Sequence, residues 1–169
     1  MDEKGVVKLG SIKTKPTKEK FDIWCDLRRF QLIVTEIRKQ LVSYRVSKIF
    51  MESPAYGAWD ISGRQAQLRG IFLYRLYLDR MFSLFPIDVA PTKLKKFVTG
   101  SGKAKKNLMG ESIRRRFSNE LLNVDFTNDD EIDAYCLAKF GQVSILIFNG
   151  ALDVKTLPKF QQETLKGFY

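Results

Sequence analysis

Histidine is absent from this 169-residue chain. Without an imidazole, the chain can form neither a Ser-His-Asp nor a Cys-His catalytic group, and it has no histidine-ligated metal site. Acid–base chemistry would therefore depend on carboxylates, lysines or metal-bound water. Carboxylate oxygens are hard ligands, which favour Mg²⁺ or Mn²⁺ over zinc.

Cysteine is scarce, and long apolar runs are missing. Cys25 and Cys136 stand alone without a Cys-x-x-Cys pattern, so neither a zinc site nor a disulfide framework is indicated. No run of 18 apolar residues is present, which argues against a membrane-spanning helix. The first residues, Met-Asp-Glu-Lys, lack the apolar segment of a signal peptide. These absences predict an intracellular protein without a membrane-spanning helix.

Acidic residues are outnumbered, with 19 Asp and Glu against 29 Lys and Arg and a net charge of +10. Such an excess predicts a polyanionic partner; nucleic acid is the first candidate and an anionic membrane surface the second. Hydrophobic residues make up 44% and aromatic residues 12%, which is enough for the core of one domain and unlike a disordered basic tail.

The basic excess is concentrated in residues 93–116, which hold nine Lys or Arg and one acid, a local excess of +8. Such a charge run is usually a solvated face. Here, however, Gly100 and Gly102 permit close backbone approach, and lysines lie on both sides of them. We therefore favour binding of a nucleic-acid backbone, by the lysines at six positions: Lys93, Lys95, Lys96, Lys103, Lys105 and Lys106.

Short apolar runs alternate with long amphipathic segments along the chain. This alternation predicts an α/β fold with one mixed sheet flanked by long helices, in a single domain over residues 1–169. The expected strands are 6–12, 47–52 and 86–90. The expected helices are 18–45, 63–85, 103–116 and 130–148, with a C-terminal helix at about 157–169.

Glu52 follows the apolar run Ile49-Phe50-Met51, so the expected strand carries it to the rim of the sheet. Active sites of α/β folds lie at strand ends, although a lone Glu there is usually a solvated boundary residue. Tyr56, in the loop that follows, could stack on an unpaired base or simply pack within its loop.

A second group of acids, Asp129-Asp130-Glu131-x-Asp133, begins an expected helix. Acids at a helix N-terminus cap it and favour its dipole, and Asn128 or Asp129 suits that role. Asp130 and Asp133 share one face of the first turn, where two carboxylates repel each other unless a cation lies between them. Helix capping and metal binding therefore both remain open for this group.

The order of these features resembles a known family. A strand ending in Glu52 is followed by Gln67-Leu-Arg-Gly70, then by Pro91…Lys95…Gly100-x-Gly102-x-Ala104-x-Lys106, and then by Asp130-x-x-Asp133-Ala134. Together with Leu9-Gly-Ser-Ile-Lys-Thr-Lys15, this set resembles the RuvC-type Holliday junction resolvases (crossover junction endodeoxyribonucleases), particularly the phage-encoded branch. The likeness runs from about residue 6 to about residue 140.

The resemblance implies an RNase H-like, Mg²⁺-dependent (or Mn²⁺-dependent) endonuclease that acts as a homodimer on four-way DNA junctions. It implies two metal ions for each active site and no small-molecule cofactor. Glu52, Asp130 and Asp133 match the second, third and fourth metal-binding acids, and they would be catalytic together with Lys106. Lys95 and Lys106 match the DNA-contacting or catalytic lysine pair.

Further implications concern the dimer, the chain's beginning and its location. The helix with Gln67, Arg69 and Gly70 matches the one that builds the family's dimer interface, and Arg69 is expected to contact DNA as well. The two opening strands and the first acid of the family pattern are expected to be absent from this chain. The location implied is the cytoplasm of a bacterial or phage-infected cell.

Two other interpretations stay open. The chain could be a non-catalytic protein that binds branched nucleic acid, or a RuvC-like nuclease that acts on other branched DNA. Binding to a membrane surface is the least favoured, because the basic residues gather around a glycine turn rather than on one helical face.

Overall fold

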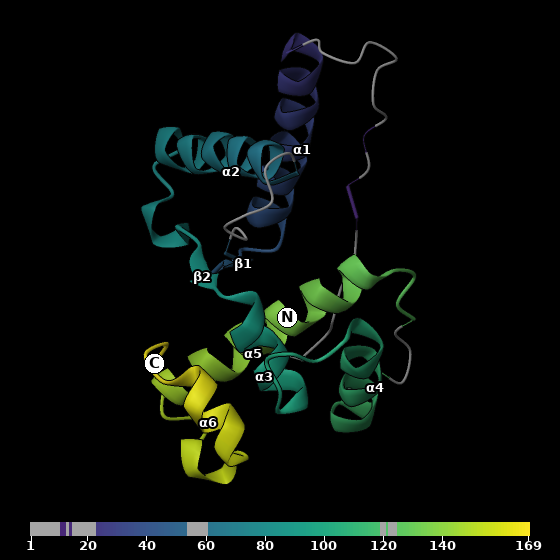
Figure 1. Cartoon of the computed structure of the whole chain (residues 1–169). Coiled ribbons are helices and arrows are strands. Elements are labelled where there is room, and N and C mark those ends of the chain that lie inside the picture. The colour runs from purple at the N-terminus through teal and green to yellow at the C-terminus, as the bar shows by residue number, and fades with distance from the viewer. Residues whose placement is uncertain (1–10, 13, 15–22, 54–60, 119–120, 122–124) are drawn as a thin grey trace. The chain divides into compact units, whose positions relative to one another are not determined.

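The computed structural model describes residues 11–12, 14, 23–53, 61–118, 121 and 125–169 of the chain (Figure 1). The chain divides into two compact units. Unit 1 comprises Met1–Gly10, Phe50–Ser53 and Ile87–Tyr169, and unit 2 comprises Ser11–Ile49 and Pro54–Pro86. In its described part the chain is mostly helical.

Unit 1 is built on two short parallel strands, β1 (Phe50–Glu52) and β2 (Ile87–Val89). Its helical elements are α3 (Pro91–Thr99), α4 (Lys106–Arg116), α5 (Asp129–Phe148), the 3-10 turn η3 (Val154–Thr156) and α6 (Lys159–Leu165). Both strands fall within the ranges that the sequence predicts, although each is only three residues long.

The mixed sheet predicted from the sequence is not seen in the described residues, whose strands form one two-stranded parallel sheet. Residues 6–10 of the first expected strand lie outside the described part. Ser11 and Ile12, which end it, are described and belong to no strand. The sheet is small because the runs 47–52 and 86–90 each contribute only three residues, 50–52 and 87–89, to strand pairing.

Phe140 of α5 is at the centre of the unit 1 core, fully buried and surrounded by other aromatic rings. The ring centroids of Phe97 and Phe168 lie 5.2 and 4.9 Å from it, and that of Phe50 on β1 lies 6.4 Å away, all edge-on. The next residue, Gly141, has to be glycine here because a Cβ would overlap the Phe50 ring. Strand β1 therefore lies directly against α5.

Helix α3 is not among the helices predicted from the sequence, which predicts no helix or strand for residues 91–102. Pro91 occupies the first helical turn, where proline is favoured, and Gly100 ends the helix in the left-handed conformation at φ 88°. The Cβ of a residue at position 102 would lie 3.2 Å from the Thr92 carbonyl oxygen. Both glycines of the Gly-x-Gly turn thus have structural roles in ending α3 and folding the chain back.

The C-terminal helix α6 packs against α3. Gln161 is buried and donates its side-chain amide to the Phe97 carbonyl at 3.1 Å, and Leu165 is fully buried. The helix is shorter than the predicted range of about 157–169, because Pro158 precedes it and a turn follows Leu165.

Unit 2 contains two paired helices, α1 (Ile23–Ser43) and α2 (Ile61–Leu78), followed by the 3-10 turn η1 (Phe82–Leu84). Phe30, Val34 and Leu41 of α1 and Phe72 and Leu76 of α2 are its buried side chains in the described residues. Helix α2 ends earlier than predicted, because Arg80 adopts a left-handed conformation at φ 55°.

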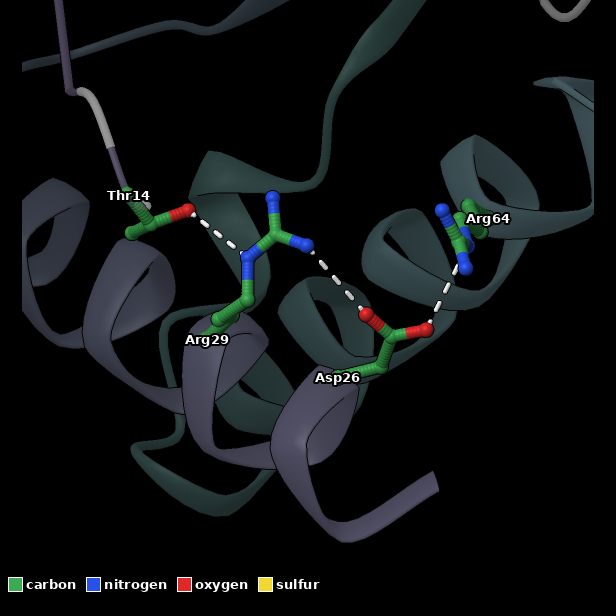
Figure 2. A network of polar contacts seen from close by, with 4 residues as sticks. All are labelled: Thr14, Asp26, Arg29 and Arg64. Atoms are coloured by element: carbon green, nitrogen blue, oxygen red, sulfur yellow. Dashed lines mark hydrogen bonds and ion pairs between the residues drawn. The ribbon is translucent and has the colours of Figure 1, made fainter. Parts of the chain in front are cut away.

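Polar contacts tie the helices of unit 2 to each other. Figure 2 shows Arg29 of α1 donating to the Thr14 hydroxyl at 3.1 Å and lying 3.3 Å from Asp26. The second Asp26 oxygen lies 3.3 Å from Arg64 of α2. Partly exposed ion pairs of this kind contribute little stability each, about 0–1 kcal/mol, so burial of the apolar side chains does more to hold the helices together.

Candidate functional site

Glu52 ends β1 on the side of the sheet that faces the core. In the parallel register Glu52 pairs with Val89, and Phe50 pairs with Ile87. Side chains alternate between faces along a strand, so Glu52 shares the face of Phe50, which contacts Gly141 of α5. Asp88, one residue earlier on β2, belongs to the opposite face together with Met51.

The N-terminus of α5 is held by a reciprocal cap. The Asn128 side chain accepts a hydrogen bond from the Glu131 backbone amide at 3.0 Å. The Glu131 carboxylate in turn accepts from the Thr127 backbone amide at 2.7 Å and from the Thr127 hydroxyl at 2.8 Å. Capping is thus accomplished by Asn128 and Glu131. Asp129, Asp130 and Asp133 remain for another role.

Lys106, the first residue of α4, brings its ammonium to this acidic turn. Its Nζ lies 3.4 Å from an Asp133 oxygen and 3.8 Å from an Asp129 oxygen. Asp129 and Asp133 are four residues apart and so lie on one face of α5. Burial lowers the pKa of Lys106, but the charges of Asp133, Asp129 and Asp130 outweigh it, and the pKa is raised.

Glu52 belongs to the same electrostatic neighbourhood. Burial and the negative charge of Asp133 raise the pKa of Glu52, while Lys106 and Lys95 act in the opposite direction. The side chain is nevertheless exposed at the strand end, so its carboxylate can be reached from solvent. The fold therefore gathers two acids and two lysines from β1, α3, α4 and α5.

This group fits a hard divalent cation in its chemistry, since Glu52 and Asp133 repel each other and both offer carboxylate oxygens. Across residues 11–12, 14, 23–53, 61–118, 121 and 125–169, however, no three or more Asp, Glu, Cys or His side chains gather closely enough to hold a metal. Asp130 acts on Lys106 through its charge, but it does not complete such a group.

The remaining lysines of the stretch divide into two sets. Lys93 and Lys96 share one face of α3 and are engaged with the C-terminal segment. Lys96 forms an ion pair with Glu163 at 2.6 Å, and Lys93 lies 4.7 Å from the centroid of the Phe168 ring. Lys103 and Lys105 are exposed in the turn before α4.

Two other predicted DNA contacts, Tyr56 and Arg69, remain predictions. Tyr56 lies outside the described residues. Arg69 is half-buried on α2, in unit 2. Conversely, the structure assigns Asp129 a contact with Lys106 that the sequence analysis did not anticipate. The four-residue spacing between Asp129 and Asp133 already indicated in the sequence that both carboxylates lie on one face of α5.

Comparison with known proteins finds similarity in structure alone. No protein-family model matches the chain, and no curated protein matches its sequence. Among solved structures, the chain is similar to that of Thermus thermophilus RuvC, with a TM-score of 0.58 and 16% sequence identity over 78% of this chain and 75% of the other. At this identity the similarity shows the fold, which is the RNase H-like fold of RuvC.

None of the helices in the described ranges is long and apolar enough to cross a membrane.

Proposed function

We propose that this chain is a RuvC-like, metal-dependent endonuclease that resolves four-way DNA junctions. The observation that carries the proposal is the convergence of Glu52, Asp133 and Lys106, which come from three separate elements of unit 1. A strand-end acid and a helix-turn acid whose negative charges repel each other, with lysines beside them, suit hydrolysis of a polyanionic backbone. The RuvC fold supports the same conclusion independently.

Glu52 and Asp133 would hold the cation. Asp130, on the same helical turn as Asp133, is the third ligand that the family resemblance implies, although its side chain does not complete a group of three acids in the described residues. The cation would be Mg²⁺ or Mn²⁺, and the family resemblance implies two ions for each site. When bound, it would neutralise charge at the scissile phosphate and lower the pKa of a bound water. The Asn128–Glu131 cap fixes the first turn of α5, so the Asp133 carboxylate stays beside the Lys106 ammonium.

The lysines would bind and neutralise the phosphodiester. Lys106 and Lys95 both act to lower the pKa of Glu52, so their ammonium groups lie close enough to the site to offset charge that builds on the phosphate. The exposed Lys103 and Lys105 would contact the backbone further along. Lys93, Lys96, Arg69 and Tyr56 complete the proposed DNA-binding set.

Homodimer formation is part of the proposal, because two sites are needed to nick two strands symmetrically. Its support is an uncovered stripe along α2. Tyr74 and Tyr77 are 62% and 57% exposed, and a Cβ at Gly63 or Gly70 would meet no atom within 4 Å. These positions recur at helical spacing, and exposed apolar stripes of this kind are typical of protein interfaces. Sedimentation of wild type and Tyr74→Asp tests the dimer, and we expect the variant to be monomeric.

A cleavage assay on a labelled four-way junction with Mg²⁺ tests the proposed activity. Linear duplex of the same sequence and a reaction with EDTA are the controls. We expect paired nicks in the junction alone, dependent on the metal. Equal cutting of linear duplex would contradict the proposed selectivity for junctions. Cutting in the presence of EDTA would contradict the proposed dependence on a metal ion.

A second candidate function is a non-catalytic protein that binds branched DNA. The absence of a three-acid group in the described part of the chain favours it. It predicts salt-sensitive junction binding without cleavage under any metal condition, so the same assay separates the two candidates.

A further inference from the structure

The ammonium of Lys106 lies against the acidic turn that begins α5. It is 3.4 Å from Asp133 and 3.8 Å from Asp129, and its charge also acts on Glu52. It therefore neutralises the carboxylates of the site from within the chain.

A divalent cation and this ammonium would compete for one carboxylate. Asp133 is three-quarters buried, with 26% of its side chain exposed, whereas the Lys106 side chain is 53% exposed. The lysine is the mobile partner, since its long stem can move while Asp133 is fixed on α5. A cation that binds Asp133 has to displace the ammonium from it.

We propose that Lys106 is a built-in counter-ion, which occupies the carboxylate site until a divalent cation displaces it and is then free to contact a DNA phosphate. This inference rests on the proposed function, and it adds a regulation of that site. Asp129 keeps the displaced ammonium close, because it lies one helical turn from Asp133 on the same face of α5.

The consequence is a coupling between metal and DNA. A phosphate that draws Lys106 away from Asp133 leaves the carboxylate open, so DNA raises the affinity for the cation. By linkage, the cation raises the affinity for DNA by the same factor. Without DNA, the lysine holds the affinity for free metal ions low.

Mn²⁺ titration followed by water proton relaxation tests the inference without any cleavage. We expect Lys106→Met to bind Mn²⁺ more tightly than wild type, by roughly two- to fivefold, the range for breaking a partly exposed ion pair. Lys106→Arg keeps the charge and should retain the wild-type affinity. Lys155→Met removes an exposed lysine from η3, and it should also bind as wild type does.

Unchanged or weaker Mn²⁺ binding by Lys106→Met overturns the inference, as does equal tightening in Lys155→Met, which would reflect net charge alone. If wild type nicks junctions but Lys106→Met shows no tightening, only this inference fails. If no variant binds Mn²⁺ and Glu52→Gln behaves as wild type does, both the inference and the metal-dependent activity fail.

Discussion

The two units of the chain differ in how they carry charge. Unit 2 holds 14 Lys and Arg against 6 Asp and Glu, a net charge of +8, while unit 1 holds 15 against 13, a net charge of +2. The candidate site nevertheless lies in unit 1. Net charge therefore does not locate the site; the meeting of acids from β1 and α5 with lysines from α3 and α4 does.

The units also differ in how completely they bury apolar residues. In unit 1 Val89, Phe97, Tyr135 and Phe140 are all fully buried. Unit 2 keeps a thin core between α1 and α2 and exposes large apolar side chains: Leu27, Leu32, Val42, Tyr44, Tyr74, Tyr77, Leu78, Phe82 and Phe85. This contrast fits the two parts of the proposal, in which unit 1 carries the candidate site and the exposed apolar surface of unit 2 serves association.

The largest expected effect concerns the acids of unit 1. Asp133→Asn should reduce junction nicking about a thousandfold or more, because metal-ion stabilisation of a transition state is worth several kcal/mol. Junction binding should change little, since lysines dominate affinity. Asp88→Asn is the matched control, because it removes an exposed carboxylate from the other face of the same sheet. An equal loss of nicking in Asp133→Asn and Asp88→Asn would contradict the assignment of the site to the Glu52 face of the sheet. Nicking rates and gel-shift affinities provide the measurement.

Core truncation compares the two units directly. Phe140→Ala removes the ring that contacts Phe50, Phe97 and Phe168, and should lower the free energy of unfolding by about 3–5 kcal/mol. Phe72→Ala in unit 2 removes a less enclosed ring, 5% exposed, and should cost less. Urea unfolding of both variants measures the difference, and a larger loss for Phe72→Ala would contradict the comparison of the cores.

Replacing a glycine by alanine should change the free energy of unfolding in opposite directions in the two units. Gly141→Ala pushes a Cβ into Phe50 and should destabilise the chain by about 1–3 kcal/mol, while displacing β1 and Glu52 enough to slow nicking. Gly70→Ala in α2 is made together with Tyr74→Asp, because Gly70 lies in the proposed dimer stripe. In that monomeric background its Cβ meets open space, and it should stabilise the helix by up to about 1 kcal/mol. Thermal unfolding of the two variants is the test, and a loss of stability in both would show that α2 is covered where the structure leaves it open.

The smallest expected effect is the pH dependence of stability from Glu52. Because its pKa is raised, the folded chain favours the protonated form, so its stabilising contribution is present below the unfolded pKa and is lost as the pH rises through the folded pKa. Glu52→Gln removes this loss and should be more stable at pH 7 by a few tenths of a kcal/mol, discounted for solvent exposure. The difference should vanish near pH 4, and denaturant midpoints at both pH values measure it. A variant less stable at pH 7 would contradict the assignment of Glu52 to a repulsive site.

Helical periodicity predicted α1, α2 and α5 well, because each has apolar residues at spacings of three and four over many turns. It missed α3, whose nine residues carry three lysines between Pro91 and Gly100. Leu94, Phe97 and Val98 are all buried at helical spacing, so the signal was present but short. The three lysines of this segment obscured its apolar periodicity.

The acids of the site were identified through a resemblance and their order along the chain, whereas their contacts depend on tertiary structure. No spacing relates Glu52 to Asp133 or Lys106, which are brought together by the packing of Phe50 against Gly141 and by the turn that ends α3 at Gly100. The capping role of Asn128 was among the alternatives considered, and the structure confirms it. The pairing of Asp129 with Lys106 required the fold.

Anomalous diffraction from a crystal of the protein soaked in Mn²⁺ tests the central claim most directly. The account predicts a manganese peak within ligand distance of the Glu52 and Asp133 carboxylates, with the Lys106 ammonium moved from Asp133. A peak elsewhere, or none at these carboxylates in a crystal that binds Mn²⁺ at other positions, would contradict it.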